Sequence, residues 1–193
     1  MTLDLSLLPD GGVRWLDAAG AHSDVVLSTR VRLARNVEGY AFTGRARDGE
    51  RLRVLVQLRE ALQVLPGLDD SFLVRIDELG PGDRALLFER HLVSKELAGL
   101  EPQHPLRTGA AVYLSDGLSV MINEEDHVRL QSLQSGFELR AAFAALDRVD
   151  RELGGRVPFS YHAEFGYLKS LLQALQVPLQ VALQVPAPAT LSP

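Results

Sequence analysis

The stretch from Ser119 to Arg129 combines a strand pattern with a dense group of ionisable side chains. Apolar residues stand at every second position from Leu118 to Ile122, which is the period of a β-strand. If the extended path continued, residues of one parity would share a face, with successive side chains about 7 Å apart. These residues are Glu125, His127, Arg129 and Gln131. Such a face could hold a phosphate and steer a nucleophile; the alternative is a solvated strand end with local charge pairs.

A second stretch, from Asp24 to Arg35, alternates in the same way. Ser28, Arg30 and Arg32 fall on one face of the expected strand, and the residues between them fall on the other. Two arginines beside a serine form a fork of donors that suits phosphate oxygens. The alternative is a solvent-facing strand with scattered charge.

Taken in order, these stretches resemble motifs of the phosphagen (guanidino) kinase family. Asn123–Arg129 resembles the family signature, and Ser28–Arg35 resembles its first phosphate-binding strand. Three further segments match in the family's order and at compatible distances: Arg90–Ser94, Val157–Ser160 and Phe165–Leu168. Several motifs in register are more specific than any one of them alone. The resemblance covers about residues 24–168 and is closest to the bacterial protein arginine kinases.

This resemblance implies ATP-dependent phosphorylation of a guanidino group, above all of arginine residues in proteins. A protonated guanidine is a poor nucleophile with a pKa above about 12. Transfer therefore needs alignment, a nearby carboxylate and neutralised phosphate charge. Glu125 is the candidate catalytic carboxylate, and Glu124 and Asp126, of opposite parity, are second candidates on the substrate side. The implied cofactors are ATP and Mg²⁺, with the ion held through the nucleotide and not by a metal site of the protein.

The nucleotide would be bound mainly by arginines. The ATP-binding positions that the resemblance implies are Ser28, Thr29, Arg30, Val31, Arg32, His91 and Arg129. His91 has an alternative role, since a lone histidine among apolar residues is more often packed than ligating. In bacteria, phosphorylated arginines of this kind are read by protein-quality-control proteases, so such a protease system is an implied partner.

The hydrophobic pattern predicts the helices and strands that carry these residues. Helical spacing predicts helices over residues 48–65, with Asp48 as N-cap, and over residues 137–153. The apolar stripe of the second helix is Leu139, Ala142, Phe143, Leu146, Val149 and Leu153. Further strands are expected at 71–77, 110–114, 118–123 and 128–133, with a hairpin turn at 115–117. This order indicates an α+β fold with a mainly antiparallel sheet covered by helices, as the resemblance to the guanidino kinase catalytic domain also implies.

The chain divides into three parts. Residues 1–22 are a lead-in in which Trp15 is expected to be a packing anchor, and residues 23–168 form a partial catalytic domain. Residues 169–193 form a low-complexity tail unlike the family, in which leucines at helical spacing are interrupted by Pro178 and Pro186. The family's cysteine-containing loop, arginine-bearing strand and second essential carboxylate have no counterpart there. A sheet without its later strands would expose an edge, which favours self-association.

Three hypotheses therefore remain open. The chain is a guanidino kinase whose function is completed by a partner or lost, an inactive homologue that binds ATP or arginine, or an interaction module that docks through its apolar tail.

Composition narrows the class of protein further. The chain has 193 residues, a net charge of -5 and no cysteine, which excludes disulfides and thiolate metal sites. The mild acidity provides no argument for a nucleic acid or a membrane surface as partner. No run is apolar for long enough to cross a bilayer. These features fit a cytoplasmic protein.

Overall fold

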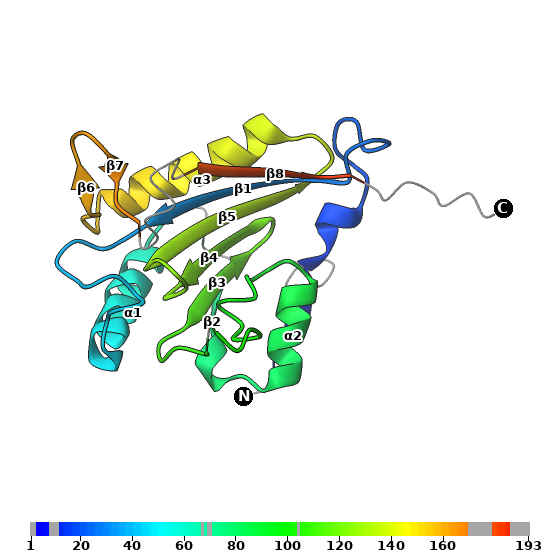
Figure 1. Cartoon of the computed structure of the whole chain (residues 1–193). Coiled ribbons are helices and arrows are strands. Elements are labelled where there is room, and N and C mark those ends of the chain that lie inside the picture. Colours follow the sequence, from blue (N-terminus) through cyan, green and yellow to red (C-terminus); the bar gives the residue numbers. More distant parts are fainter. Residues whose placement is uncertain are drawn as a thin grey trace.

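The centre of the structure is a six-stranded antiparallel sheet with the strand order β2-β3-β4-β5-β1-β8 (Figure 1). The structure is a computed structural model, and it describes residues 3–7, 12–66, 68, 71–103, 105–169 and 179–185. The strands are β1 (Ser28–Arg35), β2 (Phe72–Arg75), β3 (Ala111–Ser115), β4 (Leu118–Ile122), β5 (Val128–Ser135) and β8 (Leu179–Gln184). A short hairpin, β6 (Tyr161–His162) with β7 (Gly166–Tyr167), lies outside this sheet. The fold is thus α+β with an antiparallel sheet, as predicted.

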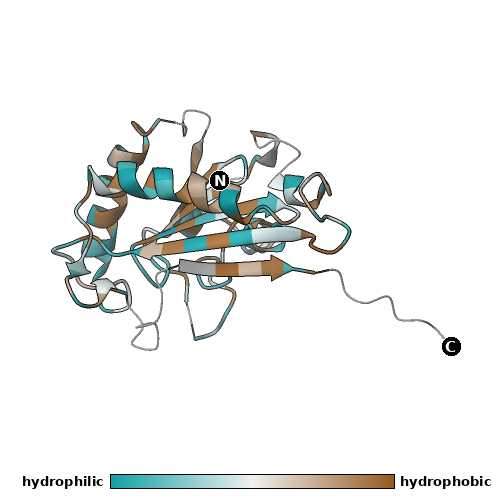
Figure 2. Cartoon of the chain, turned by 90° about the horizontal axis from the view of Figure 1, so that it is seen from above, coloured by the Kyte–Doolittle hydropathy of each residue, from teal (hydrophilic) through white to brown (hydrophobic). Residues whose placement is uncertain are grey.

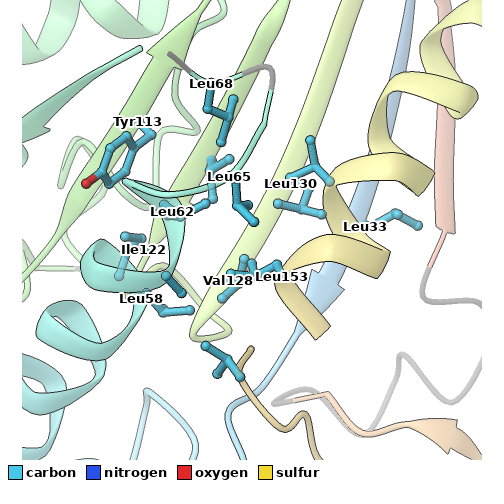
Figure 3. Packing of buried hydrophobic residues seen from close by; sticks show 14 of the residues in the cluster. Leu33, Leu58, Leu62, Leu65, Leu68, Tyr113, Ile122, Val128, Leu130 and Leu153 are labelled. Carbon is cyan, nitrogen blue, oxygen red and sulfur yellow. The ribbon is translucent and has the colours of Figure 1, made fainter. Parts of the chain in front are cut away.

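Two helices cover one face of the sheet. Helices α1 (Asp48–Leu62) and α3 (Leu139–Gly154) contribute to a core that includes Leu58, Leu130 and Leu153 (Figure 3). Alternation along the strands decides which side chains enter this core, because successive side chains of a strand point to opposite faces. On β4, Val120 and Ile122 enter it, whereas Met121 does not.

The opposite face is only partly covered by apolar side chains. Helix α2 (Pro81–Glu89) and the segment after it form a second core with Met121 and Val112 of the central strands. This second core covers the β2–β3–β4 side of the sheet. On the β5–β1 side the same face carries polar and charged side chains.

Helix α1 begins where the chain reaches Arg47. This residue is the N-cap, and its main-chain N–H donates to the Glu50 carboxylate at 2.9 Å. The prediction of Asp48 as N-cap was therefore wrong by one residue. Asp48 stands in the first turn, where a negative charge favours the helix dipole.

Helix α3 confirms four positions of the predicted stripe: Ala142, Leu146, Val149 and Leu153 are buried. The prediction was wrong for Leu139 and Phe143, which are 37% and 42% exposed on the flank of the helix. The helix also begins at Leu139 and not at 137. The N–H groups before the helix already have acceptors: Phe137 N–H donates to Ala21 O at 2.6 Å, and Glu138 N–H donates to Thr29 Oγ1 at 3.0 Å.

The tail adds an edge strand. Strand β8 pairs antiparallel with β1 from Leu33↔Leu179 to Ser28↔Gln184, and Figure 2 shows it beside β1 at the edge of the molecule. The helical prediction was wrong for 179–184, because pairing with the open edge of β1 satisfies backbone groups that would otherwise stay unpaired. Residues 171–178 and 186–193, on which the rest of that prediction falls, lie outside the described residues.

Two smaller differences concern the lead-in and β2. The expected strand at 71–77 is shorter, because Ile76–Glu78 forms a 3₁₀ helix (η4). In the lead-in, Leu5–Leu7 (η1) and Arg14–Leu16 (η3) are 3₁₀ helices, and Trp15 is buried. Within the ranges described above, no helix combines the length and apolar character needed to span a membrane.

Candidate active site

A row of arginines lies on the sheet face that α1 and α3 leave uncovered. Strand β1 contributes Arg30 and Arg32, and β5 contributes Arg129. The register places Arg32 opposite Gln131 and Arg129 opposite Ala34, so the three arginines occupy neighbouring positions of one face, about 7 Å apart. The Nε–H of Arg32 donates to Gln131 Oε1 at 2.7 Å, which fixes the plane of its guanidinium.

Two of these arginines, Arg30 and Arg32, are not fully compensated by carboxylates. Burial, together with the charges of Arg30 and Arg129, lowers the pKa of Arg32 to about 10, and the charges of Glu124 and Glu96 only partly oppose this decrease. Burial also lowers the pKa of Arg30. Both groups stay charged at neutral pH. Like charges held partly out of water are stabilised by an anion with several negative charges, so the row fits a polyphosphate.

The chain turns sharply between β4 and β5. Asn123 adopts a left-handed conformation with φ 58°, and its Nδ2 donates to Arg51 O and Gly109 O, each at 2.9 Å. The predicted extended path therefore ends at Ile122, and the parity argument was wrong for the turn residues. It remains valid for Arg129 and Gln131 within β5.

His127 does not lie on the face that the parity argument predicted for it. Its side chain is fully buried away from the arginine row. Nδ1 accepts from Val37 N–H at 3.0 Å, and Nε2 lies 2.9 Å from Ala41 O. Burial lowers the pKa of His127, so the ring is neutral with its proton on Nε2. The residue fixes the loop after β1 and holds no phosphate.

The two adjacent glutamates of the turn have different environments. Glu124 is 2% exposed and binds the Nε of Arg129. Glu125 is 32% exposed in its side chain, and its Oε2 lies 3.2 Å from Nη2 of Arg129. Partial burial and the neighbouring Glu124 raise the pKa of Glu125, and Arg129 opposes this increase. Glu124 thus orients Arg129, whereas Glu125 keeps an accessible carboxylate.

Asp126 connects the turn to the end of β1. It accepts from Asn36 Nδ2 at 2.7 Å, and Asn36 Oδ1 accepts from His127 N–H at 3.0 Å. Asp126 is 4% exposed. These contacts give it a fixed position in which it supports the turn.

His91 lies at the other end of the arginine row. Burial and the charges of Arg30 and Arg32 lower the pKa of its imidazole, which is therefore neutral. The ring lines a cavity of about 330 Å³ together with Trp15, Gln131 and the β3–β4 hairpin at Asp116. A planar neutral ring thus stands between the arginines and this cavity.

Comparison with known proteins identifies the family. A sequence profile described as "ATP:guanido phosphotransferase, C-terminal catalytic domain" matches residues 53–187. The chain belongs to the ATP:guanido phosphotransferase family. The match extends from within α1 to just beyond β8.

Curated relatives of this chain are named protein-arginine kinases. It is 33% identical over 177 residues to the "Protein-arginine kinase" of Bacillus subtilis (strain 168), covering 91% of this chain and 47% of the relative. It is 36% identical over 169 residues to the enzyme of the same name from Moorella thermoacetica, covering 85% of this chain and 47% of the relative. The chain spans about half the length of these curated relatives.

Solved structures of guanidino kinases share the fold. The duplicated taurocyamine kinase from Schistosoma mansoni with bound transition state analog components has a TM-score of 0.76 at 25% identity, over 95% of this chain and 26% of that chain. A lombricine kinase has a TM-score of 0.72 at 22% identity, over 95% of this chain and 52% of that chain, which supports the fold alone.

Eight of the site residues expected from the sequence divide into two groups. Arg30, Arg32 and Arg129 lie together on one face, with Glu125 at one end and His91 at the other. Three further expected residues are engaged within the protein. Ser28 Oγ donates to Gln184 Oε1 at 3.3 Å, Thr29 Oγ1 donates to Gly136 O at 2.7 Å, and Val31 is fully buried in the core.

Sequence reasoning missed several supporting residues. Arg107 donates to the main-chain carbonyl of Glu124 from a proline-containing loop, where no pattern distinguishes it from other arginines. Asn36 follows directly after β1, and its role is apparent only from the contact with the turn. Among the residues that the structure describes, no three His, Asp or Glu side chains gather as a metal-binding group.

Proposed function

We propose that this chain binds Mg²⁺–ATP through Arg30, Arg32 and Arg129 and transfers the γ-phosphoryl group to a guanidino nitrogen placed against Glu125. One observation supports this proposal above all: a row of guanidinium groups, of which Arg30 and Arg32 are under-compensated, ends at the partly accessible carboxylate of Glu125. Arginines match phosphate oxygens, and a carboxylate matches the guanidinium of an acceptor.

The reaction requires few covalent steps. The bond between the γ-phosphorus and the ADP oxygen breaks, a bond between phosphorus and the guanidino nitrogen forms, and Glu125 takes the proton that the nitrogen loses. Positioning and charge stabilisation supply most of the catalysis of such a transfer. The Glu124 pair keeps Arg129 in a fixed orientation, while the partly exposed carboxylate of Glu125 can accept a proton. Mg²⁺ bound to the nucleotide would reduce the negative charge of the phosphates.

The nucleoside part of ATP fits the cavity beside His91. Its volume of about 330 Å³ is within the range of small-molecule sites, which begins at about 300 Å³. The cavity has rings at Trp15 and His91 and hydrogen-bonding groups at Gln131 and Ser119. It adjoins the arginine row through His91, so one molecule could bind both regions.

Arginine side chains of proteins are the proposed acceptor. The names of the curated relatives support this choice. By the same resemblance, a protein-quality-control protease system in the cytoplasm is the proposed reader of the product. The absence of cysteine is compatible with that compartment.

A labelling experiment tests the function. The chain is incubated with γ-labelled ATP, Mg²⁺ and an arginine-rich protein, and the acid-labile label on protein is counted. We expect label with the wild-type chain and at least a hundredfold less with Glu125→Gln. The matched control is Glu78→Gln, which changes an exposed glutamate outside the site. Absence of label with the wild-type chain would contradict catalysis.

A second candidate is ATP binding without turnover. It is favoured by the composition of β8, which contains neither an arginine nor a carboxylate at the edge next to Arg32. In that case ATP would raise the melting temperature of the wild-type chain but not of Arg32→Ala, and no label would reach protein. If ATP neither binds nor reacts, both candidates are wrong.

We also propose self-association through the outer edge of β8. The strand has no charged residue or proline to protect its open backbone groups, and Val181 and Leu183 are 46% and 45% exposed. The partner is a second copy of the chain, paired strand to strand. Light scattering should show a dimer that Val181→Lys dissociates, whereas a monomeric wild-type chain would contradict the proposal. If deletion of residues 171–193 abolished a complex with another protein instead, the tail would be an interaction segment.

A further inference from the structure

We propose that Trp15 is a positioning residue that holds His91 against the nucleoside part of the nucleotide. The inference rests on the proposed function for its ligand, but its structural basis is independent of that function. It assigns a role in the site to the lead-in, which the sequence indicated only as a packing segment.

The contacts of Trp15 lead directly to His91. The indole Nε1–H donates to the main-chain oxygen of Arg90 at 3.3 Å. The indole and imidazole rings meet edge to face, with centroids 4.9 Å apart and an interplanar angle of 70°. The same side chain therefore binds the peptide group before His91 and contacts its ring.

His91 needs such support because of its backbone conformation. Its φ is 58°, a left-handed value that residues other than glycine adopt only at an energetic cost. Neighbouring contacts must compensate for that cost. Trp15 binds the carbonyl of Arg90, and Gln131 Nε2 donates to the carbonyl of His91 at 2.7 Å. The strained residue is thus held by one donor on each side.

Gln131 links this support to the phosphate-binding row. Its Nε2 donates to His91 O, and its Oε1 accepts from Arg32 Nε. One amide group therefore sets the relative position of the imidazole and a guanidinium. Trp15 completes the arrangement by binding the carbonyl of the preceding residue, Arg90.

The lead-in that carries Trp15 is itself fixed on the end of β5. Ala19 N–H donates to Ser135 Oγ at 3.2 Å. A Cβ on Gly20 would lie 1.8 Å from Ser135 O, so only glycine permits this close approach. The indole is consequently attached to the sheet by a segment with little freedom, and it can transmit that rigidity to His91.

A change of Trp15 should weaken the binding of the nucleoside part of the ligand and not the binding of its phosphates. The hydrogen bond and the ring contact found for Trp15 among the described residues involve Arg90 and His91 and none of Arg30, Arg32 and Arg129, so the affinity for phosphate groups should not depend on the indole. Affinity for the nucleoside should depend on it, because the imidazole and the indole line the same cavity.

Binding measurements on the full chain test this selectivity. Dissociation constants for ATP and for inorganic tripolyphosphate, both with Mg²⁺, are measured for wild type, Trp15→Phe and Trp15→Leu. The Phe variant keeps a ring but loses the N–H donor, so we expect ATP affinity to fall about threefold, and about tenfold in the Leu variant. Tripolyphosphate affinity should stay within twofold. The control is Leu16→Ala, which changes an exposed neighbour.

A nucleotide-free measurement separates this inference from the proposed function. NMR titration of His91, assigned with His91→Gln, reports its surroundings in the free chain. We expect a pKa below the ordinary histidine value in wild type and a return toward that value in Trp15→Leu. An unchanged titration, or equal losses of ATP and tripolyphosphate affinity, would overturn the positioning role. If wild type bound no ATP, the proposed function would fail while the titration still decided the role of Trp15.

Discussion

Arg129 binds the carboxylate of Glu124 through its Nε, and both side chains are almost completely buried, at 8% and 2% exposure. Burial lowers the pKa of Arg129, but Glu124, together with the charges of Asp126 and Glu125, more than offsets this decrease and raises the pKa overall. Two charges removed from water in this way depend on each other, since either one alone would be an uncompensated buried charge.

Glu124→Gln should therefore destabilise the fold. We expect the free energy of unfolding to fall by about 3 kcal/mol, because Arg129 would keep only its longer contact with Glu125. Urea denaturation followed by circular dichroism measures the change. The matched control is Asp147→Asn, which removes an exposed pair with Arg151 and should cost less than about 0.5 kcal/mol. Equal effects of the two substitutions would contradict the structural role of Glu124.

The acid limb of the pH–rate profile should lie at a higher pH than the limb expected for an ordinary glutamate. Partial burial and Glu124 raise the pKa of Glu125, so its carboxylate gains a proton at a higher pH than an ordinary glutamate, which titrates near about 4.3. The base form, and with it the rate, is lost as the pH falls through that raised value. The rate of label transfer against pH measures this limb, with the folded fraction checked in the same buffers. A limb at or below the ordinary value would argue against Glu125 as base.

Arg32→Ala should separate binding from stability. The alanine variant loses a guanidinium whose neighbours Arg30 and Arg129 repel it. We expect ATP affinity to fall at least tenfold, while the free energy of unfolding stays the same or rises by about 1 kcal/mol. Calorimetric titration and urea denaturation give the two quantities. Arg53→Ala, on the exposed side of α1, should change neither. A large loss of stability in Arg32→Ala would indicate a structural residue.

His127→Phe should change how stability depends on pH. The pKa of His127 is lowered by burial in the folded state, so the unfolded chain takes up a proton first as the pH falls below the ordinary value of about 6.5. Wild type thus loses stability with falling pH, and the Phe variant should lose less. At neutral pH the variant should be about 2 kcal/mol less stable, because Val37 N–H loses its acceptor. Denaturation curves at neutral and mildly acidic pH measure both effects, and parallel pH profiles would contradict the assignment.

The strands of the site could be predicted because their signal is local. Alternation along 28–35 and 128–133 is set by neighbouring residues, so the shared face of Arg30 and Arg32 followed directly from their spacing. The hairpin at 115–117 was predicted for the same reason, since its turn residues stand beside the strands they join. Helix α3 was predicted from its period, except on the flank where Phe143 is exposed.

The turn and the tail could not be predicted in this way. Asn123 turns the chain because its amide donates to the main-chain carbonyls of Arg51 and Gly109. Both residues are distant from Asn123 in the sequence, so a local pattern does not predict these contacts. In the tail, leucine spacing suggested a helix, but the open edge of β1 provided hydrogen-bond partners for a strand. In both places the competing interaction came from a distant part of the chain.

The residue types, the parity of each strand and the two adjacent glutamates can be read from the printed chain. The folded molecule is needed to see that Arg129 lies beside Arg32, that Glu124 is buried against Arg129 while Glu125 stays accessible, and that Trp15 contacts His91. The physical reason is the register of β1 with β5, which joins residues about a hundred positions apart through hydrogen bonds and burial. Register of that kind is a property of the assembled sheet, and no single strand contains it.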